Sequence, residues 1–117
     1  MERKELLKNI VETLDKKKAT DIKSLEITDL TVVADYFVIA TGTSGTHLRS
    51  LADEVEDRLS QLGVEPGHIE GKATGWILLD YGTVIVHLFT ADQREHFNLE
   101  HLWADAADMD ISEFITE

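Results

Sequence analysis

The sequence predicts a single α/β domain, with a mixed β-sheet of about five strands flanked by helices. The chain has 117 residues, which suits one domain with one hydrophobic core. A near-continuous apolar run over residues 36–40 indicates a strand that is buried on both faces. Apolar residues at helical spacing follow over residues 48–62, so this strand and helix form half of an α/β unit. We expect one domain over residues 1–117, with residues 106–117 as a partly mobile acidic tail.

Two elements precede this unit. Residues 3–18 are predicted to form an amphipathic helix, because five apolar residues recur on one helical face. These residues are Leu6, Leu7, Ile10, Val11 and Leu14. A lysine run over residues 16–18 lies near the end of this helix, where positive charge suits the helix dipole. Residues 22–28 alternate imperfectly between apolar and polar side chains, which indicates a short strand.

The loop over residues 41–46 opens the second helix. Thr43 or Ser44 is the expected N-cap, and Gly63 and Pro66 end the helix. Hydroxyl and N–H groups at such a helix start can also hold a phosphate. The loop lacks the Gly-x-x-x-x-Gly-Lys-Ser/Thr pattern of a P-loop, and a simple helix cap is the other interpretation.

A β-hairpin is predicted after residue 75, with strands over residues 76–80 and 83–89 and a turn at Tyr81-Gly82. A two-residue turn at this place pairs Trp76 with His87, and directly paired residues share a face. One face is entirely aliphatic and is expected to pack on the helices. Its members are Ile77, Leu79, Val84, Val86 and Leu88.

The opposite face of the hairpin mixes aromatic rings with a carboxylate and an imidazole. Its members are Trp76, Leu78, Asp80, Ile85, His87 and Phe89. Such a mixture suits a partner interface, where aromatic anchors dominate the binding energy and polar groups set the register. The alternative is that a helix covers this face and that His87 is a satisfied core histidine.

The charge of the chain is strongly acidic, with 11 Lys and Arg residues against 23 Asp and Glu residues and a formal net charge of −12. This field repels nucleic acid and anionic lipid and favours basic partners, although an acidic surface can also serve solubility alone. No segment has the length of a membrane span, and the N-terminus lacks the apolar core of a secretion signal. Since the chain also has no cysteine, we expect a cytoplasmic protein.

Patterns typical of enzymes and metal sites do not stand out. The five histidines form no His-Glu-x-x-His pattern, and no serine lies in a Gly-x-Ser-x-Gly turn. Nucleotidyltransferases need closely spaced carboxylates on a following strand, and here the nearest later strand offers only Asp80. We therefore expect no catalytic residue, metal or cofactor. The rival hypothesis is a nucleotide-binding or nucleotidyl-transferring enzyme that uses Thr43, Ser44 and Asp80.

Several motifs occur in a fixed order along the chain. They are ADYFVIATGTS at 34–44, EG at 70–71, WILLDYG at 76–82, VIVHLF at 84–89, Arg94, and LEHLWAD at 99–105. This ordered set resembles the ribosomal silencing factor family, also called RsfS or Iojap, over residues 5–106. The chain departs from the family at residues 96–98, where His-Phe-Asn replaces a Tyr or Phe-Tyr pair and leaves Phe97 as the aromatic residue.

The resemblance implies a fold and a function. The family fold is a mixed sheet with flanking helices, related to nucleotidyltransferases but without their catalytic residues. Its members bind the large ribosomal subunit through ribosomal protein number fourteen and block joining of the small subunit, which represses translation when nutrients are short. Organelle relatives assist assembly of the large subunit, so an assembly factor is an alternative.

On this interpretation we expect ten residues to contact the partner. Six lie in the hairpin: Trp76, Leu78, Asp80, Tyr81, His87 and Phe89. The other four are Asp35, Tyr36, Arg94 and Trp103. We expect Asp80 to pair with a Lys or Arg of the partner. An exposed aromatic patch also favours self-association, so we expect a homodimer when the protein is free.

Overall fold

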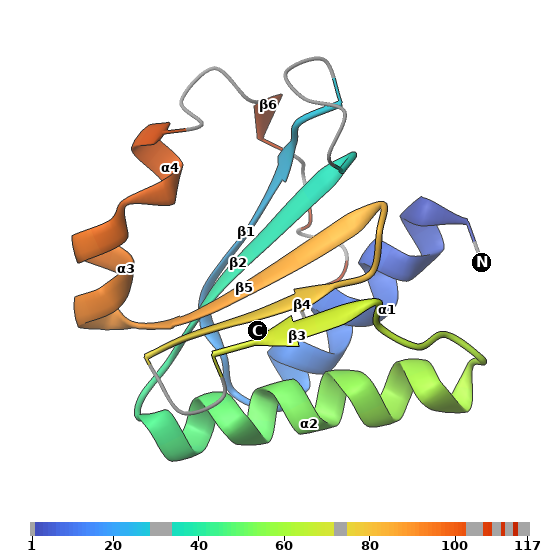
Figure 1. Ribbon diagram of the computed structural model, residues 1–117, viewed down its shortest axis with the longest axis horizontal. Helices are drawn as coiled ribbons and strands as arrows, with labels where there is room; N and C mark the ends of the chain where they lie inside the picture. The colour runs from blue at the N-terminus through green and yellow to red at the C-terminus, as the bar shows by residue number, and fades with distance from the viewer. Residues whose placement is uncertain are drawn as a thin grey trace.

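A mixed β-sheet with the strand order β3-β4-β5-β2-β1-β6 forms the centre of the computed structural model (Figure 1). The structure describes residues 2–28, 34–71, 75–102, 107–108, 111 and 114. In chain order the elements are α1 (Arg3–Lys16), β1 (Thr20–Glu26), β2 (Tyr36–Gly42), α2 (Gly45–Gln61), β3 (His68–Glu70), β4 (Trp76–Asp80), β5 (Val84–Thr90), α3 (Ala91–Phe97), α4 (Leu99–Leu102) and β6 (Ala107–Asp108). Only β2 and β5 pair in parallel among these strands, and the other pairs are antiparallel. The predicted mixed sheet with flanking helices is confirmed.

The strand β2 lies inside the sheet, between β5 and β1. All of its residues are buried, because side chains pack on both of its faces. The apolar run at residues 36–40 therefore predicted both the strand and its two-sided burial correctly. The strand continues through Thr41 to Gly42, where a tighter contact with α2 begins. A Cβ atom on Gly42 would lie 2.8 Å from Leu48 Cδ2, so a larger residue would push against the helix.

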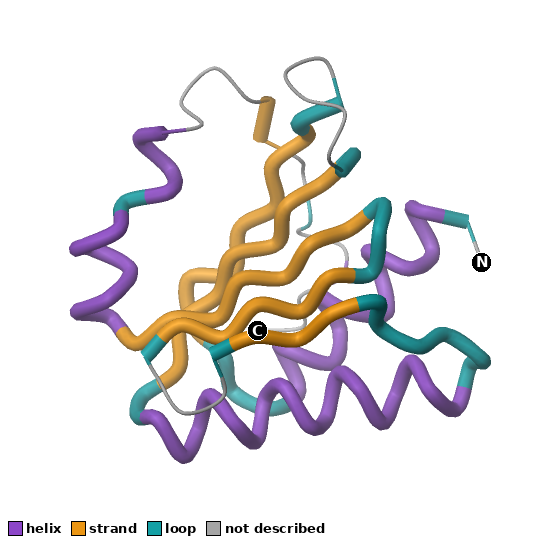
Figure 2. Tube along the Cα trace, in the orientation of Figure 1, coloured by secondary structure: helices purple, strands orange, loops and turns teal. Residues whose placement is uncertain are grey.

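Helices α1 and α2 cover one face of the sheet, and Figure 2 shows them together below and behind the strands. The predicted apolar stripes of both helices are buried against this face, except for Leu62 at the end of the second stripe, which is 37% exposed. The members are Leu6, Leu7, Ile10, Val11 and Leu14 of α1, and Leu48, Leu51, Ala52, Val55 and Leu59 of α2. Ser44, rather than Thr43, is the N-cap of α2, and its Oγ accepts a hydrogen bond from the His47 N–H at 3.1 Å.

The predicted register of the β4–β5 hairpin is wrong by two residues. Trp76 lies opposite Phe89, not opposite His87. The Tyr81 N–H donates to the Val84 carbonyl at 3.0 Å, so the turn is Gly82-Thr83 and not Tyr81-Gly82. Gly82 takes a φ of 84°, a left-handed conformation that glycine adopts without strain. A shift of two residues keeps every side chain on its predicted face, because side chains alternate with a period of two.

Three elements were not predicted. The short strand β3 pairs with β4 and forms one edge of the sheet, while β6 pairs with β1 at the other edge. Helix α3 follows β5 directly, in a segment that the sequence marked only as polar. The predicted helix near residues 99–103 corresponds to α4, and Ile111 of the predicted tail is buried. β6 also lies in this tail, and Phe114 is partly buried against the same core, while the other tail residues lie outside the described part of the chain.

The helix-covered core gives a prediction about stability. Leu51→Ala removes a fully buried side chain of α2, so the free energy of unfolding should fall by about 2–5 kcal/mol. Urea denaturation measures this change. Ser50→Ala, at the exposed neighbouring position, should change stability by less than about 0.5 kcal/mol. Equal losses in the two variants would contradict the assignment of this helical face to the core.

Candidate docking groove

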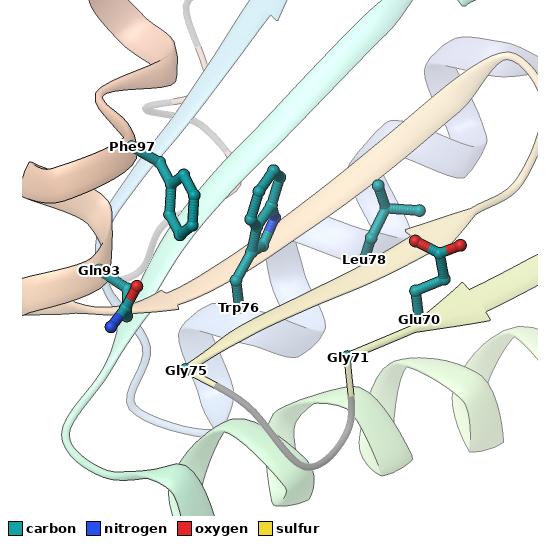
Figure 3. Close-up of a pocket in the computed structure, with 7 residues that line it drawn as sticks. All are labelled: Glu70, Gly71, Gly75, Trp76, Leu78, Gln93 and Phe97. Atoms are coloured by element: carbon teal, nitrogen blue, oxygen red, sulfur yellow. The ribbon is translucent and has the colours of Figure 1, made fainter.

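A groove of about 390 Å³ opens where β3 and β4 meet helix α3 (Figure 3). Its lining residues are Glu70, Gly71, Gly75, Trp76, Leu78, Gln93 and Phe97. The floor is made by the side chains that β4 directs away from α1 and α2, and α3 supplies one wall. Two of the ten predicted contact residues, Trp76 and Leu78, lie in this groove and are half-buried.

Trp76 is the centre of an aromatic cluster beside the groove. Its ring stacks on Phe89 with a centroid separation of 5.1 Å, and the ring of Phe97 lies 4.6 Å away on α3. Phe97 is 44% exposed, an unusual degree of exposure for a phenylalanine. Aromatic pairs at these distances contribute about 0.5–1.5 kcal/mol beyond burial, so the three rings hold one another in place.

Gly75 permits the close approach of α3 to the start of β4. A Cβ atom at this position would lie 2.6 Å from Gln93 Cγ and 3.0 Å from Thr90 Oγ1. The Gly75 carbonyl accepts a hydrogen bond from the Thr90 N–H at 3.0 Å, which joins the end of β5 to the groove. A larger residue at position 75 would therefore displace the wall of the groove.

His87 lies beneath the groove and is only 4% exposed. The Trp76 Nε1–H donates to His87 Nδ1 at 3.1 Å. An indole nitrogen can only donate, so Nδ1 carries no proton and the neutral ring holds its proton on Nε2. That Nε2 atom is buried without a hydrogen-bond partner. Burial lowers the pKa of His87 to about 4, which keeps the ring neutral and able to orient Trp76.

Three predicted contact residues are too deeply buried to meet a partner. Phe89 is 1% exposed and lies under Trp76, and His87 lies beside it. Tyr36 is buried on the opposite face, in the core formed with α1 and α2. The prediction that these residues form an accessible surface is wrong, because the sheet face is covered over β5. The alternative of a core histidine is correct for His87, although only one of its ring nitrogens is satisfied.

Tyr81 and Asp80 also differ from their predicted role. Tyr81 points to the helix-covered face, where burial and then the charges of Glu56 and Glu65 raise the pKa of its hydroxyl. It therefore does not share a surface with Trp76. Asp80 lies on the face of the groove but at the far end of β4, and its Oδ1 accepts a hydrogen bond from the Gly82 N–H at 2.8 Å. This bond stabilises the hairpin turn.

The remaining candidates lie at different places. Asp35 pairs with Arg3 of α1 at 3.2 Å, near the start of β2. Arg94 of α3 is paired with Glu100 at 3.0 Å and is largely buried. Trp103 lies outside the residues that the structure describes. The predicted contact residues thus do not form one surface, and only Trp76 and Leu78 line the groove.

The residues of the rival enzyme hypothesis do not converge. Thr43 and Ser44 follow the C-terminal end of β2, beside the C-terminal end of the parallel strand β5. Asp80 pairs with Ile85 near the start of β5. The hydroxyls and the carboxylate are therefore separated by about six residues of strand, or roughly 20 Å. Within the described ranges, no three His, Asp or Glu side chains gather in a way that could hold a metal ion.

Sequence reasoning missed most of the groove. Glu70, Gly71, Gly75 and Gln93 were not assigned to it, and Phe97 was noted only as a departure from the family pattern. The signal for Phe97 was available: an aromatic residue in a short polar segment directly after a buried strand. Strand β3 pairs with β4 and so brings Glu70 to the groove. This strand has only three residues, which is too few to show an alternating pattern in the sequence.

The fold and the groove define a small α/β protein with a largely apolar groove open at its surface. None of the helices among the described residues is long and apolar enough to cross a bilayer. The profile of the family described as "Ribosomal silencing factor during starvation" matches residues 1–117. The chain belongs to this ribosomal silencing factor family, as its motifs predicted, and the family name describes a regulatory factor rather than an enzyme.

Individual relatives agree with this assignment. The ribosomal silencing factor RsfS of Bacillus subtilis is 39% identical over 114 residues, which cover 95% of this chain and 97% of the relative. The Arabidopsis thaliana protein named Iojap-related, mitochondrial, is 37% identical and matches 67% of this chain and 48% of its own length. A crystal structure of a Chromobacterium violaceum protein gives a TM-score of 0.86 at 33% identity, covering 89% of this chain and 88% of that one.

The buried neutral His87 gives a prediction about pH. Its pKa of about 4 in the folded protein lies below the value of about 6.5 expected in the unfolded chain. As pH falls from 6.5 to 4, the unfolded state binds a proton that the folded state does not. The free energy of unfolding should therefore fall over this range, by about 3 kcal/mol from this group.

Urea denaturation at several pH values measures this loss. His87→Gln should flatten the dependence between pH 6.5 and 4 relative to the unmodified protein. His101→Gln, at an exposed position, is the control and should leave the dependence unchanged. An equally steep dependence in His87→Gln would mean that other groups cause the loss.

Proposed function

We propose that the protein represses translation by binding the large ribosomal subunit through ribosomal protein number fourteen and blocking the joining of the small subunit. Membership of the ribosomal silencing factor family supports a role in ribosome regulation. The observation that carries the proposal is the open groove with Trp76 in its floor and Phe97 in its wall. Its half-exposed aromatic residues would bury apolar area on contact with a partner.

The chemistry of the groove suits one kind of partner segment. Trp76, Leu78 and Phe97 offer apolar contact area. The exposed carboxylate of Glu70 lies at the rim, where one of its oxygens pairs with His68 Nε2 at 2.6 Å. An apolar side chain with a neighbouring Lys or Arg would satisfy both features. Tryptophan anchors beside polar rims are typical of the residues that carry most of the binding energy in protein interfaces.

The charge of the chain supports the same choice of partner. A net charge of −12 attracts a basic protein surface over a distance of about 8–10 Å at physiological salt and speeds encounter. The same field repels ribosomal RNA, so a protein contact is favoured over an RNA contact. The association rate should consequently fall as salt concentration rises.

Substitutions in the groove test the docking surface. Trp76→Ala should weaken binding to purified large subunits by roughly 2 kcal/mol or more, as truncation of a central aromatic anchor does. Leu78→Ala should weaken binding as well, whereas Leu62→Ala, at an exposed leucine on the last turn of the α2 region, should not. Thermal unfolding checks that all three variants fold. Equal affinity of Trp76→Ala and the unmodified protein would remove the groove from the proposal.

Light scattering of subunit association tests the repression step. With large subunits saturated by the protein, addition of small subunits should give little or no increase in scattering, because the bound protein occupies the joining surface. Leu62→Ala should block joining as well as the unmodified protein does. Normal joining with confirmed binding would contradict repression and favour the assembly-factor alternative.

A further inference from the structure

Helix α3 is held to the sheet in an unusual way. None of its residues is buried, so its apolar contacts with the sheet are made by partly exposed side chains. Its last residue, Phe97, nevertheless forms the wall of the groove against Trp76. A helix of seven residues is also too short to be stable by itself in water. The ring contacts of Phe97 with Trp76 and Phe89 hold the end of α3, and a second interaction joins its middle to the sheet.

Arg94 supplies this interaction from the middle of α3. Its guanidinium group makes two hydrogen bonds to the Glu100 carboxylate of α4, at 3.0 and 3.3 Å. It also donates to the Asp21 carbonyl of β1 at 2.6 Å and to Thr41 Oγ1 of β2 at 2.8 Å. The side chain is only 13% exposed. One cation thus joins α3, α4 and two strands of the sheet.

Two residues near these contacts have left-handed backbone conformations, which bring acceptor groups within hydrogen-bonding distance of the guanidinium group. Asp21 has a φ of 48° and lies where the β1–β2 register shifts, so its carbonyl is not in a regular ladder position. Asn98 has a φ of 47° and turns the chain between α3 and α4, which brings Glu100 back toward Arg94. The hydrogen bond from Arg94 holds the pKa of Glu100 below its ordinary value, so the pair remains charged.

We infer that Arg94 is a positioning residue, which sets the groove wall by holding Phe97 over Trp76 and does not itself contact the partner. This inference rests on the proposed function, since it assigns a role at the same groove. A lysine cannot reproduce the fork that contacts Glu100 and the strands together. Loss of the fork would leave α3 with the ring contacts of the partly exposed Phe97 and no buried residue, so Phe97 would shift away from Trp76.

The first test needs no partner. In a Trp103→Phe background, Trp76 is the sole tryptophan, and acrylamide quenching reports its exposure. Arg94→Lys should raise the quenching of Trp76 toward the value of Phe97→Ala. Arg49→Lys, at an exposed arginine of α2, is the control and should leave it unchanged. Unchanged quenching in Arg94→Lys would overturn the inference. If Arg94→Lys does not fold, Glu100→Gln tests the same clamp from α4.

The second test uses purified large ribosomal subunits in a double-mutant cycle. Arg94→Lys and Phe97→Ala should each weaken binding about tenfold, and the double variant should be little weaker than either. If the loss of affinity in the double variant equals the product of the two single losses, Arg94 acts independently of Phe97 and contacts the partner directly. This result would overturn the inference. Failure of the unmodified protein to bind large subunits would instead overturn the proposed function, while the quenching result would still decide the role of Arg94.

Discussion

The two-sided burial of the parallel pair β2 and β5 is the constraint on which the rest of the molecule depends. Both strands are buried along almost their whole length, so each face of the sheet must be covered. Helices α1 and α2 cover one face with aliphatic side chains. The other face is covered over β5 by aromatic rings and left partly open over β4, nearer the edge of the sheet. The groove is the place where this second covering ends.

The floor and the wall of the groove are held in place by different interactions. Its floor belongs to β4, which lies between two other strands and is oriented further by the hydrogen bond from Trp76 to the neutral ring of His87. Its wall belongs to α3, which has no buried residue and is joined to the sheet by polar contacts of Arg94. Side chains that are held in place before binding reduce the entropy cost of binding.

The sequence predicted the parts of the fold that follow from hydrophobic periodicity. The apolar run of residues 36–40 predicted β2, and the apolar stripes predicted α1 and α2. These elements are predictable because their apolar residues are the ones that the core buries. The two faces of the hairpin were also predicted correctly, although the register was wrong. The turn at Gly82-Thr83 depends on backbone conformation at one glycine, which the pattern of apolar residues does not specify.

The site was predicted less well, for a physical reason. The exposure of a hairpin side chain depends on which segments from elsewhere in the chain cover that face of the sheet. The sequence of the hairpin does not contain that information. His87 and Phe89 are of the residue types expected in an exposed patch, but both are buried. His87 packs against Phe37 and Trp76, and Phe89 packs against Trp76 and Phe97. Arg94 is charged, as a residue that contacts a partner at the surface often is. Its guanidinium group instead donates a hydrogen bond to the Asp21 carbonyl, at an irregular point of β1 that is far away in the sequence.

A cryo-electron microscopy reconstruction of the protein bound to the large ribosomal subunit tests the central claim most directly. The account predicts that an apolar side chain of ribosomal protein number fourteen, next to a Lys or Arg, contacts both Trp76 and Phe97, while Arg94 remains paired with Glu100. A complex in which the subunit instead contacts the outer surface of α1 and α2, and the groove stays open to solvent, would contradict it.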